Sequence, residues 1–128
     1  QCWGRNRAGQ TDEPIGTFRD VSAGAKHTCG VRARSGVLQC WGSNESGEAE
    51  PVVGTFCQVS AGGGHACAVT PSRSIRCWGS DTYDEATPPP LTILDVSAGR
   101  DHTCGRVESG NIQCWGRNHF GQSRPPTP

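Results

Sequence analysis

The tripeptide Cys-Trp-Gly occurs four times in the chain, at residues 2–4, 40–42, 77–79 and 114–116. The steps between successive copies are 38, 37 and 37 residues, and a fixed period of this length indicates stacked supersecondary units. All 4 tryptophans lie in these copies: Trp3, Trp41, Trp78 and Trp115. We therefore expect function to reside in a repeat rather than in a single site.

Two further motifs divide the chain into repeats. Val-Ser-Ala-Gly and then His-x-Cys precede each of the last three Cys-Trp-Gly copies. The sequence starts in mid-repeat, which favours a processed product or an interior piece of a longer chain. The expected organisation is the end of a truncated repeat at 1–10, repeats at 11–47, 48–84 and 85–122, and a proline-rich linker or tail at 123–128.

Composition and alternation favour short strands. Only 33% of residues are apolar, and 18 glycines with 9 prolines are typical of strands joined by tight turns. Because side chains alternate across a strand, His27, Cys29 and Val31 share one face, as do Leu38 and Cys40 after the turn. Each repeat is therefore expected to contain an antiparallel hairpin with its apolar residues and cysteines on one side.

The 8 cysteines indicate an oxidising compartment, and with it an extracellular or cell-surface location. Ten residues lie between the two cysteines of the first hairpin and nine between those of the next two, so each hairpin can bring its pair together. The predicted disulfides are Cys29 with Cys40, Cys67 with Cys77, and Cys104 with Cys114. Each should add roughly 2 to 3 kcal/mol of stability.

Two cysteines are left over. Cys2 occupies the second-cysteine position of a repeat whose first cysteine is absent, so its natural partner is the His-x-Cys strand of a preceding repeat. Cys57 stands where the other repeats have Arg19 and Leu94. These two cysteines could bond to each other, bond to neighbouring polypeptide or stay free, and the sequence leaves the three alternatives open.

Charge and hydropathy exclude several partners. The 12 basic residues balance 12 acidic ones, so no broad field attracts nucleic acid or anionic lipid. No apolar run approaches the roughly 18 residues of a membrane helix. We expect neither nucleic-acid binding nor membrane insertion.

Three histidines, each two residues before a cysteine, raise the question of metal binding: His27, His65 and His102. Structural zinc sites use four ligands and commonly close cysteine pairs, which are absent here. We therefore expect no metal and no cofactor, and histidines that are hydrogen-bonded within the blade. A serine also recurs in each repeat, but no acidic residue recurs at all three periods to orient a base, so no catalytic residue and no enzyme is predicted.

Two local features carry expectations about shape. The small residues of Ser-Ala-Gly permit close approach of neighbouring backbones where wedge-shaped sheets converge on an axis, or else form a simple turn. Residues 81–84 lack both the asparagine and the glycine that the other copies have after Cys-Trp-Gly. That loop is expected to differ from its siblings.

Two stretches predict glycosylation. Asn44 begins an Asn-x-Ser pattern on an expected exposed turn. Pro88, Pro89 and Pro90 resemble the proline-rich stretches that plant and algal matrix proteins hydroxylate and glycosylate. The second hypothesis is the weaker one because it rests on composition.

Taken together, Val-Ser-Ala-Gly, His-Thr-Cys-Gly-Val and Cys-Trp-Gly-x-Asn-x-x-Gly-Gln resemble the repeat family of the regulator of chromosome condensation. The cysteine-bearing version is similar to that of secreted proteins and plant crinkly-type receptor ectodomains. The resemblance implies an all-β propeller, usually of about seven four-stranded blades. With about three and a half repeats, the chain is expected to form a partial propeller or an open superhelical array.

The sequence thus predicts a non-enzymatic extracellular structural or protein-interaction module. Its partners would be other copies or other repeats of the same protein, which would complete a propeller or a filament. The alternative is a carbohydrate-binding lectin of propeller type, in which repeated loops hold glycans and the tryptophans supply stacking faces. Nucleotide exchange or chromatin binding, as in the protein that names the family, conflicts with the cysteine count and the neutral charge.

Overall fold

The structure, a computed structural model, describes residues 1–119, 121 and 123. These residues form nine strands and no helix, which confirms the all-β expectation. Accordingly, none of them belongs to a helix long and apolar enough to cross a membrane. Apart from residue 123, the proline-rich tail expected at 123–128 lies outside the described residues. The strands are β1 (Phe18–Ala23), β2 (His27–Arg32), β3 (Leu38–Gly42), β4 (Gln58–Ala61), β5 (His65–Val69), β6 (Ile75–Gly79), β7 (Ile93–Ala98), β8 (His102–Val107) and β9 (Ile112–Gly116).

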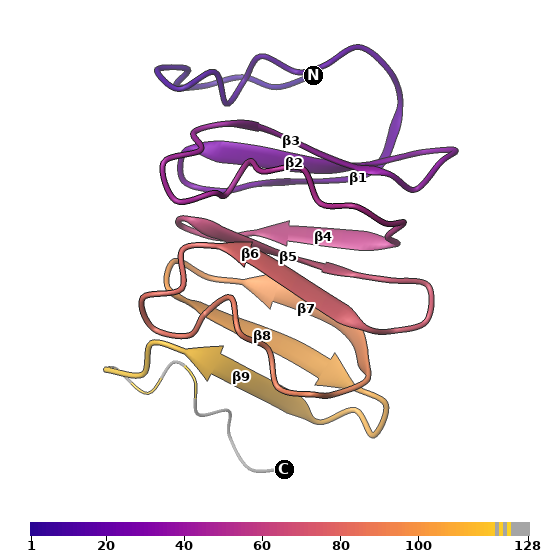
Figure 1. The fold of residues 1–128 in the computed structure, drawn as a ribbon, viewed down its shortest axis with the longest axis vertical. Coiled ribbons are helices and arrows are strands. Elements are labelled where there is room, and N and C mark those ends of the chain that lie inside the picture. The colour runs from indigo at the N-terminus through magenta and orange to yellow at the C-terminus, as the bar shows by residue number, and fades with distance from the viewer. Residues whose placement is uncertain (120, 122, 124–128) are drawn as a thin grey trace.

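Each repeat contributes one antiparallel sheet, in the orders β1-β2-β3, β4-β5-β6 and β7-β8-β9. The sheets follow one another as layers along the long axis, and the N-terminal segment forms a further layer beyond the first sheet (Figure 1). Each sheet has three strands among the described residues, one fewer than the resemblance implies. The connectors after β3 and β6 contain Pro51 and Pro88–Pro90, which lack the N–H groups that a fourth strand would need.

The three predicted disulfides are present. Each joins residues that face each other directly across a strand pair: Cys29 and Cys40, Cys67 and Cys77, Cys104 and Cys114. Their Cα–Cα distances are 4.1, 4.1 and 4.0 Å. Val31 likewise faces Leu38, so the cysteines and apolar residues share a face as the alternation predicts.

The core lies between the sheets rather than inside any one of them. One apolar cluster joins Cys29, Val31 and Leu38 to residues of the second repeat: Phe56, Val59, Ala61, Ala66 and Ala68. A second cluster joins Cys67 and Val69 to the third repeat: Ile93 and Val96. Each repeat therefore has a cysteine face toward the next repeat (Cys29, Val31, Leu38 and their equivalents). It has a valine face toward the preceding one (Phe56, Val59, Ala61 and their equivalents).

The Ser-Ala-Gly motif brings neighbouring backbones together, as expected of converging sheets. A Cβ atom on Gly24 would lie 2.4 Å from the Gly62 carbonyl oxygen, and one on Gly62 would lie 2.3 Å from the Gly99 carbonyl oxygen. The backbone N–H of Ala25 donates to the same Gly62 oxygen at 3.1 Å. Side chains do not fit at such distances, so glycine is needed where the layers meet.

The expectation that residues 81–84 differ from their siblings is wrong. Asp81 Oδ1 accepts a hydrogen bond from the Ala86 N–H at 2.8 Å, as Asn44 Oδ1 does from the Ala49 N–H at 2.9 Å. Asp84 has a φ of 61°, in the same left-handed region as the equivalent glycines. A carboxylate oxygen replaces the amide oxygen as acceptor, and aspartate tolerates this region better than most residues.

Candidate interaction surface

Side chains of β1 bind the backbone of β4. Ser22 Oγ accepts a hydrogen bond from the Ala61 N–H at 2.9 Å. Two residues earlier, Asp20 Oδ2 accepts one from the Val59 N–H, also at 2.9 Å. The first joint between repeats is thus a pair of side-chain acceptors on β1 and a pair of N–H donors on β4.

The joint between β4 and β7 repeats this pattern. Ser60 Oγ accepts from the Ala98 N–H at 2.9 Å, and Gln58 Oε1 accepts from the Val96 N–H at 3.0 Å. Gln58 Nε2 also donates to the Val96 carbonyl oxygen at 3.2 Å. The recurring serine is therefore a joint between repeats, and the residue two positions before it is a second joint that the sequence analysis missed.

On β1 the valine face is uncovered. Val21 is 56% exposed, whereas its equivalents Val59 and Val96 are 3% and 4% exposed. Among the described residues, no side chain accepts a hydrogen bond from the N–H groups of Val21 and Ala23 in the way that Ser22 does from Ala61. The first repeat therefore presents two backbone donors and an apolar face of the kind that a preceding repeat covers at the other two joints.

The N-terminal segment occupies only the outer edge of this face. The Gln10 carbonyl oxygen accepts hydrogen bonds from Thr28 Oγ1 at 2.9 Å and Trp41 Nε1 at 3.1 Å. Two hollows of about 480 and 560 Å³ lie between residues 1–2 and β1, and both are lined by Cys2 and Val21. The segment thus takes the place of the last strand and loop of a preceding repeat, with open space on its inner side.

At the opposite end, the cysteine face of the third repeat is polar. Arg106, whose side chain is 50% exposed, stands where the other repeats have Val31 and Val69, both buried. Its Nε and Nη2 donate to Asp95 Oδ2 at 3.0 and 2.7 Å. Asp95 is the equivalent of the Asp20 acceptor, so a group that could bind a following repeat is paired within its own sheet. The two ends of the array are not alike.

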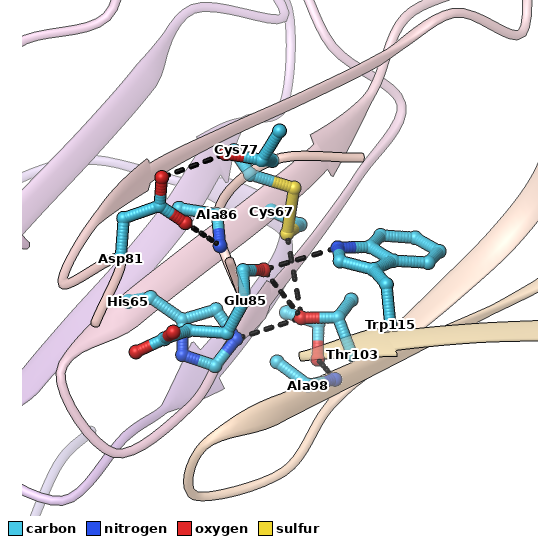
Figure 2. The surroundings of a disulfide bond; sticks show 11 residues. His65, Cys67, Cys77, Asp81, Glu85, Ala86, Ala98, Thr103 and Trp115 are labelled. Carbon is cyan, nitrogen blue, oxygen red and sulfur yellow. Dashed lines mark hydrogen bonds between the residues drawn. A yellow bond between two sulfur atoms is a disulfide. The ribbon is translucent and has the colours of Figure 1, made fainter. Parts of the chain in front are cut away.

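The second disulfide is held against the third repeat through Thr103 (Figure 2). Thr103 Oγ1 lies 2.8 Å from His65 Nε2, 3.0 Å from the Glu85 carbonyl oxygen and 3.9 Å from Cys67 Sγ. Trp115 Nε1 donates to the same carbonyl at 3.1 Å. Because the hydroxyl gives its single proton to the carbonyl, the histidine must donate from Nε2, which assigns its neutral tautomer.

Among the described residues, His27 and His65 do not form hydrogen bonds within their own blades, contrary to the prediction. His65 forms a hydrogen bond with Thr103 of the next repeat. At the first joint, Ala66 is in the equivalent position, so no hydroxyl is there to bond to the ring of His27. Both ring nitrogens of His27 lack a hydrogen-bond partner among the described residues. Both rings are fully buried, and this burial lowers the pKa of His27 and of His65. Each is therefore neutral at pH 7.

The His-x-Cys sets do not gather metal ligands. Their cysteines are bonded to one another, and within residues 1–119, 121 and 123 no group of three or more candidate ligand side chains comes together. The ring of His102 packs against Gly99.

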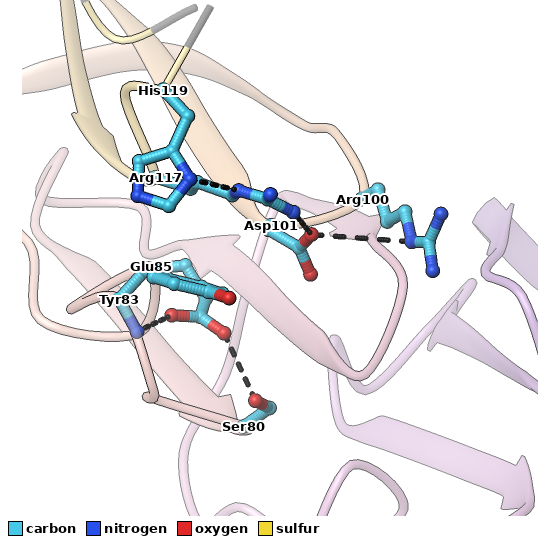
Figure 3. Close-up of polar contacts among 7 residues, drawn as sticks. All are labelled: Ser80, Tyr83, Glu85, Arg100, Asp101, Arg117 and His119. Carbon is cyan, nitrogen blue, oxygen red and sulfur yellow. Dashed lines mark hydrogen bonds and ion pairs between the residues drawn. The ribbon is translucent and has the colours of Figure 1, made fainter.

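A polar cluster ties the loops after β6 and β9 (Figure 3). Arg117 Nη1 lies 3.3 Å from Asp101 Oδ2, and Arg117 Nε donates to His119 Nδ1 at 3.2 Å. The guanidinium carbon lies 5.2 Å from the centre of the Tyr83 ring. The buried Glu85 accepts from the Tyr83 N–H at 2.7 Å. Arg117 pairs with Asp101, and the Glu85 carboxylate accepts hydrogen bonds from Ser80 and Tyr83 of its own loop, which suits a role in holding the loops.

A shallow hollow of about 750 Å³ lies where the turns after β1, β4 and β7 converge. Glycine backbone forms much of its lining, and its charged residues are of both signs: Lys26, Glu45, Glu48, Arg100 and Asp101. Glu48 is buried, and although burial raises the pKa of a carboxyl, hydrogen bonds from backbone N–H groups and Ser43 lower the pKa of Glu48. The negative charge of Glu48 is therefore already satisfied by the loop that carries it.

The structure places the two leftover cysteines in different environments. Neither is bonded, so the alternative in which they bond to each other is not found. Cys57 is exposed, whereas Cys2 is half-buried and lines the hollows beside β1. Burial, and then a hydrogen bond with Glu13, raises the pKa of the Cys2 thiol.

The remaining predicted sites fall on loops. Asn44 is exposed, and its amide already bonds within the loop, because Nδ2 donates to Glu50 Oε1 at 2.6 Å. Pro88 and Pro89 are half-buried, and Pro90 is exposed. Glycosylation of Asn44 and of the prolines stays a prediction.

The tryptophans serve packing in three of the four copies. Each of these three donates a hydrogen bond from Nε1 to a backbone carbonyl oxygen of the preceding loop: Trp41 to Gln10 at 3.1 Å, Trp78 to Glu48 at 3.0 Å and Trp115 to Glu85 at 3.1 Å. None of these three is exposed, whereas Trp3 is 85% exposed. Stacking faces of the kind that the lectin alternative requires are thus not displayed once in each repeat.

This geometry defines a class: disulfide-bonded antiparallel blades of the propeller type, stacked through side chain-to-backbone joints. The sequence pattern of the regulator of chromosome condensation (RCC1) repeat matches residues 18–48, 56–85 and 93–122, which is more than half of the chain. The chain belongs to this family. Each match contains one of the three sheets.

Several solved structures share the fold. The entire ectodomain of the receptor kinase CR4 from Physcomitrella patens has a TM-score of 0.82 at 26% identity, over 98% of this chain and 38% of that one. The CRINKLY WD40 ectodomain of the receptor kinase ACR4 from Arabidopsis thaliana has a TM-score of 0.74 at 26% identity, over 98% and 45%. Yeast RCC1 (Prp20), solved bound to Kap60, has a TM-score of 0.74 at 15% identity, over 91% and 39%, which shows likeness of fold alone. The chain spans less than half the length of each of these structures, and no curated protein sequence matches it.

Proposed function

We propose that this chain is a non-enzymatic extracellular interaction module that binds further repeats of its own kind at the valine face of β1. Binding there would extend the array toward a propeller or a filament. The observation that carries the proposal is the contrast between Val21, more than half exposed, and its buried equivalents Val59 and Val96. The same surface is a repeat-to-repeat joint in two of its three occurrences.

The chemistry of the joint indicates what would bind. A partner needs two hydrogen-bond acceptors spaced two residues apart on one strand, matching Asp20 and Ser22 of β1 at the first joint. Each hydrogen bond of this kind contributes about 0.5–1.5 kcal/mol net. Full burial of a valine contributes up to about 1.5–3 kcal/mol. These contributions oppose the loss of translational and rotational freedom on association, so a partner whose strand pair is already formed should bind best.

Two observations support an extracellular setting. The three disulfides are typical of oxidising compartments. The two solved structures that match at 26% identity are ectodomains of plant receptor kinases. Ser22 and Ser60 are engaged in joints and the cysteines of the three hairpins in disulfides, which supports a role in contact rather than catalysis.

The test is a titration of the isotope-labelled oxidised chain with a synthetic hairpin. The hairpin has the sequence of residues 18–32, carries Cys29→Ser and is cyclised, because an isolated strand pair is only marginally stable. The matched control hairpin also carries Asp20→Ala and Ser22→Ala. We expect saturable shifts of the Val21 and Ala23 amide signals with the first hairpin and weaker ones with the control. Equal responses to both, or no response at these amides, would contradict the proposal.

A further inference from the structure

We propose that Cys2 forms a disulfide with the cysteine of a His-x-Cys strand that a partner hairpin places between the N-terminal segment and β1. This inference rests on the proposed function and adds a covalent bond to it. It identifies the occupant of the uncovered face as a strand pair of the same repeat type that brings its own cysteine and lacks a third strand of its own.

The register of the repeats assigns this role to Cys2. In the three complete repeats, the cysteine before Trp-Gly faces the cysteine of the middle strand of its own sheet: Cys40 faces Cys29, Cys77 faces Cys67, and Cys114 faces Cys104. Cys2 also stands before Trp-Gly. The bond that it lacks is the one that the other repeats make within their own hairpin.

The space beside Cys2 matches the missing strands. Cys2 lines both hollows of about 480 and 560 Å³, with Val21 in each and Thr28 in the smaller. At the joint between the second and third repeats, Cys67 Sγ lies 3.9 Å from Thr103 Oγ1. Thr28 is the equivalent of Thr103, so a sulfur atom bonded to Cys2 would meet the first repeat as Cys67 meets the third.

A second copy of the chain fits this space poorly. Residues 114–119 of the copy would fall where residues 2–7 already lie, because both segments follow the same Cys-Trp-Gly register. The copy would also bring Arg106, paired with Asp95, to a position that is apolar at the internal joints. Its Cys104 is already bonded to Cys114. A separate hairpin with a free or activated cysteine meets none of these obstacles.

The bond forms by thiol–disulfide exchange. The partner cysteine arrives as a mixed disulfide with a small thiol such as glutathione. The Cys2 thiol loses its proton to solvent, and the resulting thiolate attacks the partner sulfur. A new S–S bond forms between Cys2 and the partner, the old S–S bond breaks, and the small thiol leaves with the electron pair. The exchange needs no further oxidant.

Intrinsic reactivity alone favours the other free thiol. Cys57 is exposed, whereas burial and Glu13 raise the pKa of Cys2 and so reduce its thiolate fraction. A small reagent should therefore modify Cys57 first. Preference for Cys2 can arise only if a docked partner raises the local concentration of the attacked sulfur, which makes Cys57 an internal control.

The experiment uses the oxidised chain and a linear hairpin of residues 18–32 whose Cys29 is activated with 5-thio-2-nitrobenzoate. Release of the coloured thiol gives the rate, and peptide mapping under non-reducing conditions gives the site. Activated glutathione is the untemplated control. A hairpin of residues 93–107, activated at Cys104, is the matched control because it carries Arg106 at the position of Val31.

We expect the hairpin of residues 18–32 to shift the ratio of Cys2 to Cys57 modification by about tenfold or more relative to activated glutathione. The hairpin of residues 93–107 should shift it less, and Val21→Asp in the chain should abolish the preference. The same ratio for all three reagents would overturn the inference. If the cyclised hairpin still shifts the Val21 and Ala23 signals in that case, only the covalent step is wrong; if it does not, the proposed function falls as well.

Discussion

The residue after the recurring histidine is alanine in the second repeat (Ala66) and threonine in the third (Thr103), and this difference provides a test of how the repeats are held together. At the second joint, Thr103 Oγ1 accepts a hydrogen bond from His65 Nε2 and donates one to the Glu85 carbonyl oxygen. At the first joint Ala66 is in this position, and His27 has no partner among the described residues. Replacing Ala66→Thr should supply the missing hydroxyl, and replacing Thr103→Ala should remove the existing one.

The magnitude follows from the burial of these groups. Thr103 and both rings are fully buried, so an unpaired ring nitrogen costs about 1–3 kcal/mol. Thr103→Ala should therefore lower the free energy of unfolding by about 1–3 kcal/mol, with a further loss for the deleted methyl group. Ala66→Thr should raise it by about 1 kcal/mol, because the new hydroxyl would take the place that Thr103 Oγ1 has at the second joint. The valine variants at both positions fill the same space without a hydroxyl.

The assay is denaturation by guanidinium chloride at pH 7.5 without reductant, followed by tryptophan fluorescence. The decisive quantity is the difference between threonine and valine at each position, because the two side chains are similar in size and differ chiefly in the hydroxyl. We expect threonine to be more stable than valine by about 1–3 kcal/mol at both joints. Equal stabilities of the threonine and valine variants at residue 66 would refute the view that His27 lacks a partner that a hydroxyl can supply.

Three further predictions follow from the joints and loops. Gly62→Ala should destabilise the fold by about 1–3 kcal/mol, because its Cβ would lie 2.3 Å from a carbonyl oxygen of the next repeat, while Gly64→Ala, with its nearest atom at 3.4 Å, should change stability little; thermal melting distinguishes them. Burial lowers the pKa of His27 below the ordinary 6.5, so the unfolded chain binds the proton more readily than the folded one. The contribution of neutral His27 to the free energy of unfolding is therefore complete above about pH 6.5 and is lost as the pH falls toward the lowered pKa. Unfolding free energies at pH 7.5 and 5.5 should show this loss, and a smaller one in His27→Gln; an unchanged slope in that variant would count against it. Asp84→Gly should stabilise the loop by up to about 1 kcal/mol, since Asp84 has a φ of 61°, and a lower melting temperature would contradict this.

Strand pairing and the three disulfides were predictable from the sequence because they depend on local spacing. The alternation of His27, Cys29 and Val31 placed the cysteine on the apolar face, and the nine or ten residues between the two cysteines of a hairpin allowed them to face each other. The close approach at Gly24 was also accessible, since a run of small residues permits either close backbone packing or a simple turn, and the structure shows the close packing.

The joints between repeats were less accessible because they depend on partners about 38 residues away. Asp20 and Gln58 differ in charge, so their common role as acceptors for a backbone N–H group was not visible in the residue types. The bonding of His65 to the next repeat was missed for the same reason. Arg106 at a valine position was a visible signal, but its meaning required knowing which face the following repeat covers.

The central claim is that repeats are joined by side-chain acceptors on the first strand of one sheet and backbone donors on the first strand of the next, and that β1 presents these donors uncovered. Amide hydrogen exchange of the oxidised chain, resolved by residue, tests it most directly. We predict slow exchange at the bonded donors Val59, Ala61, Val96 and Ala98, fast exchange at Val21 and Ala23, and slower exchange at these two when the cyclised hairpin is added. Equal protection of all six amides in the chain alone would contradict the claim.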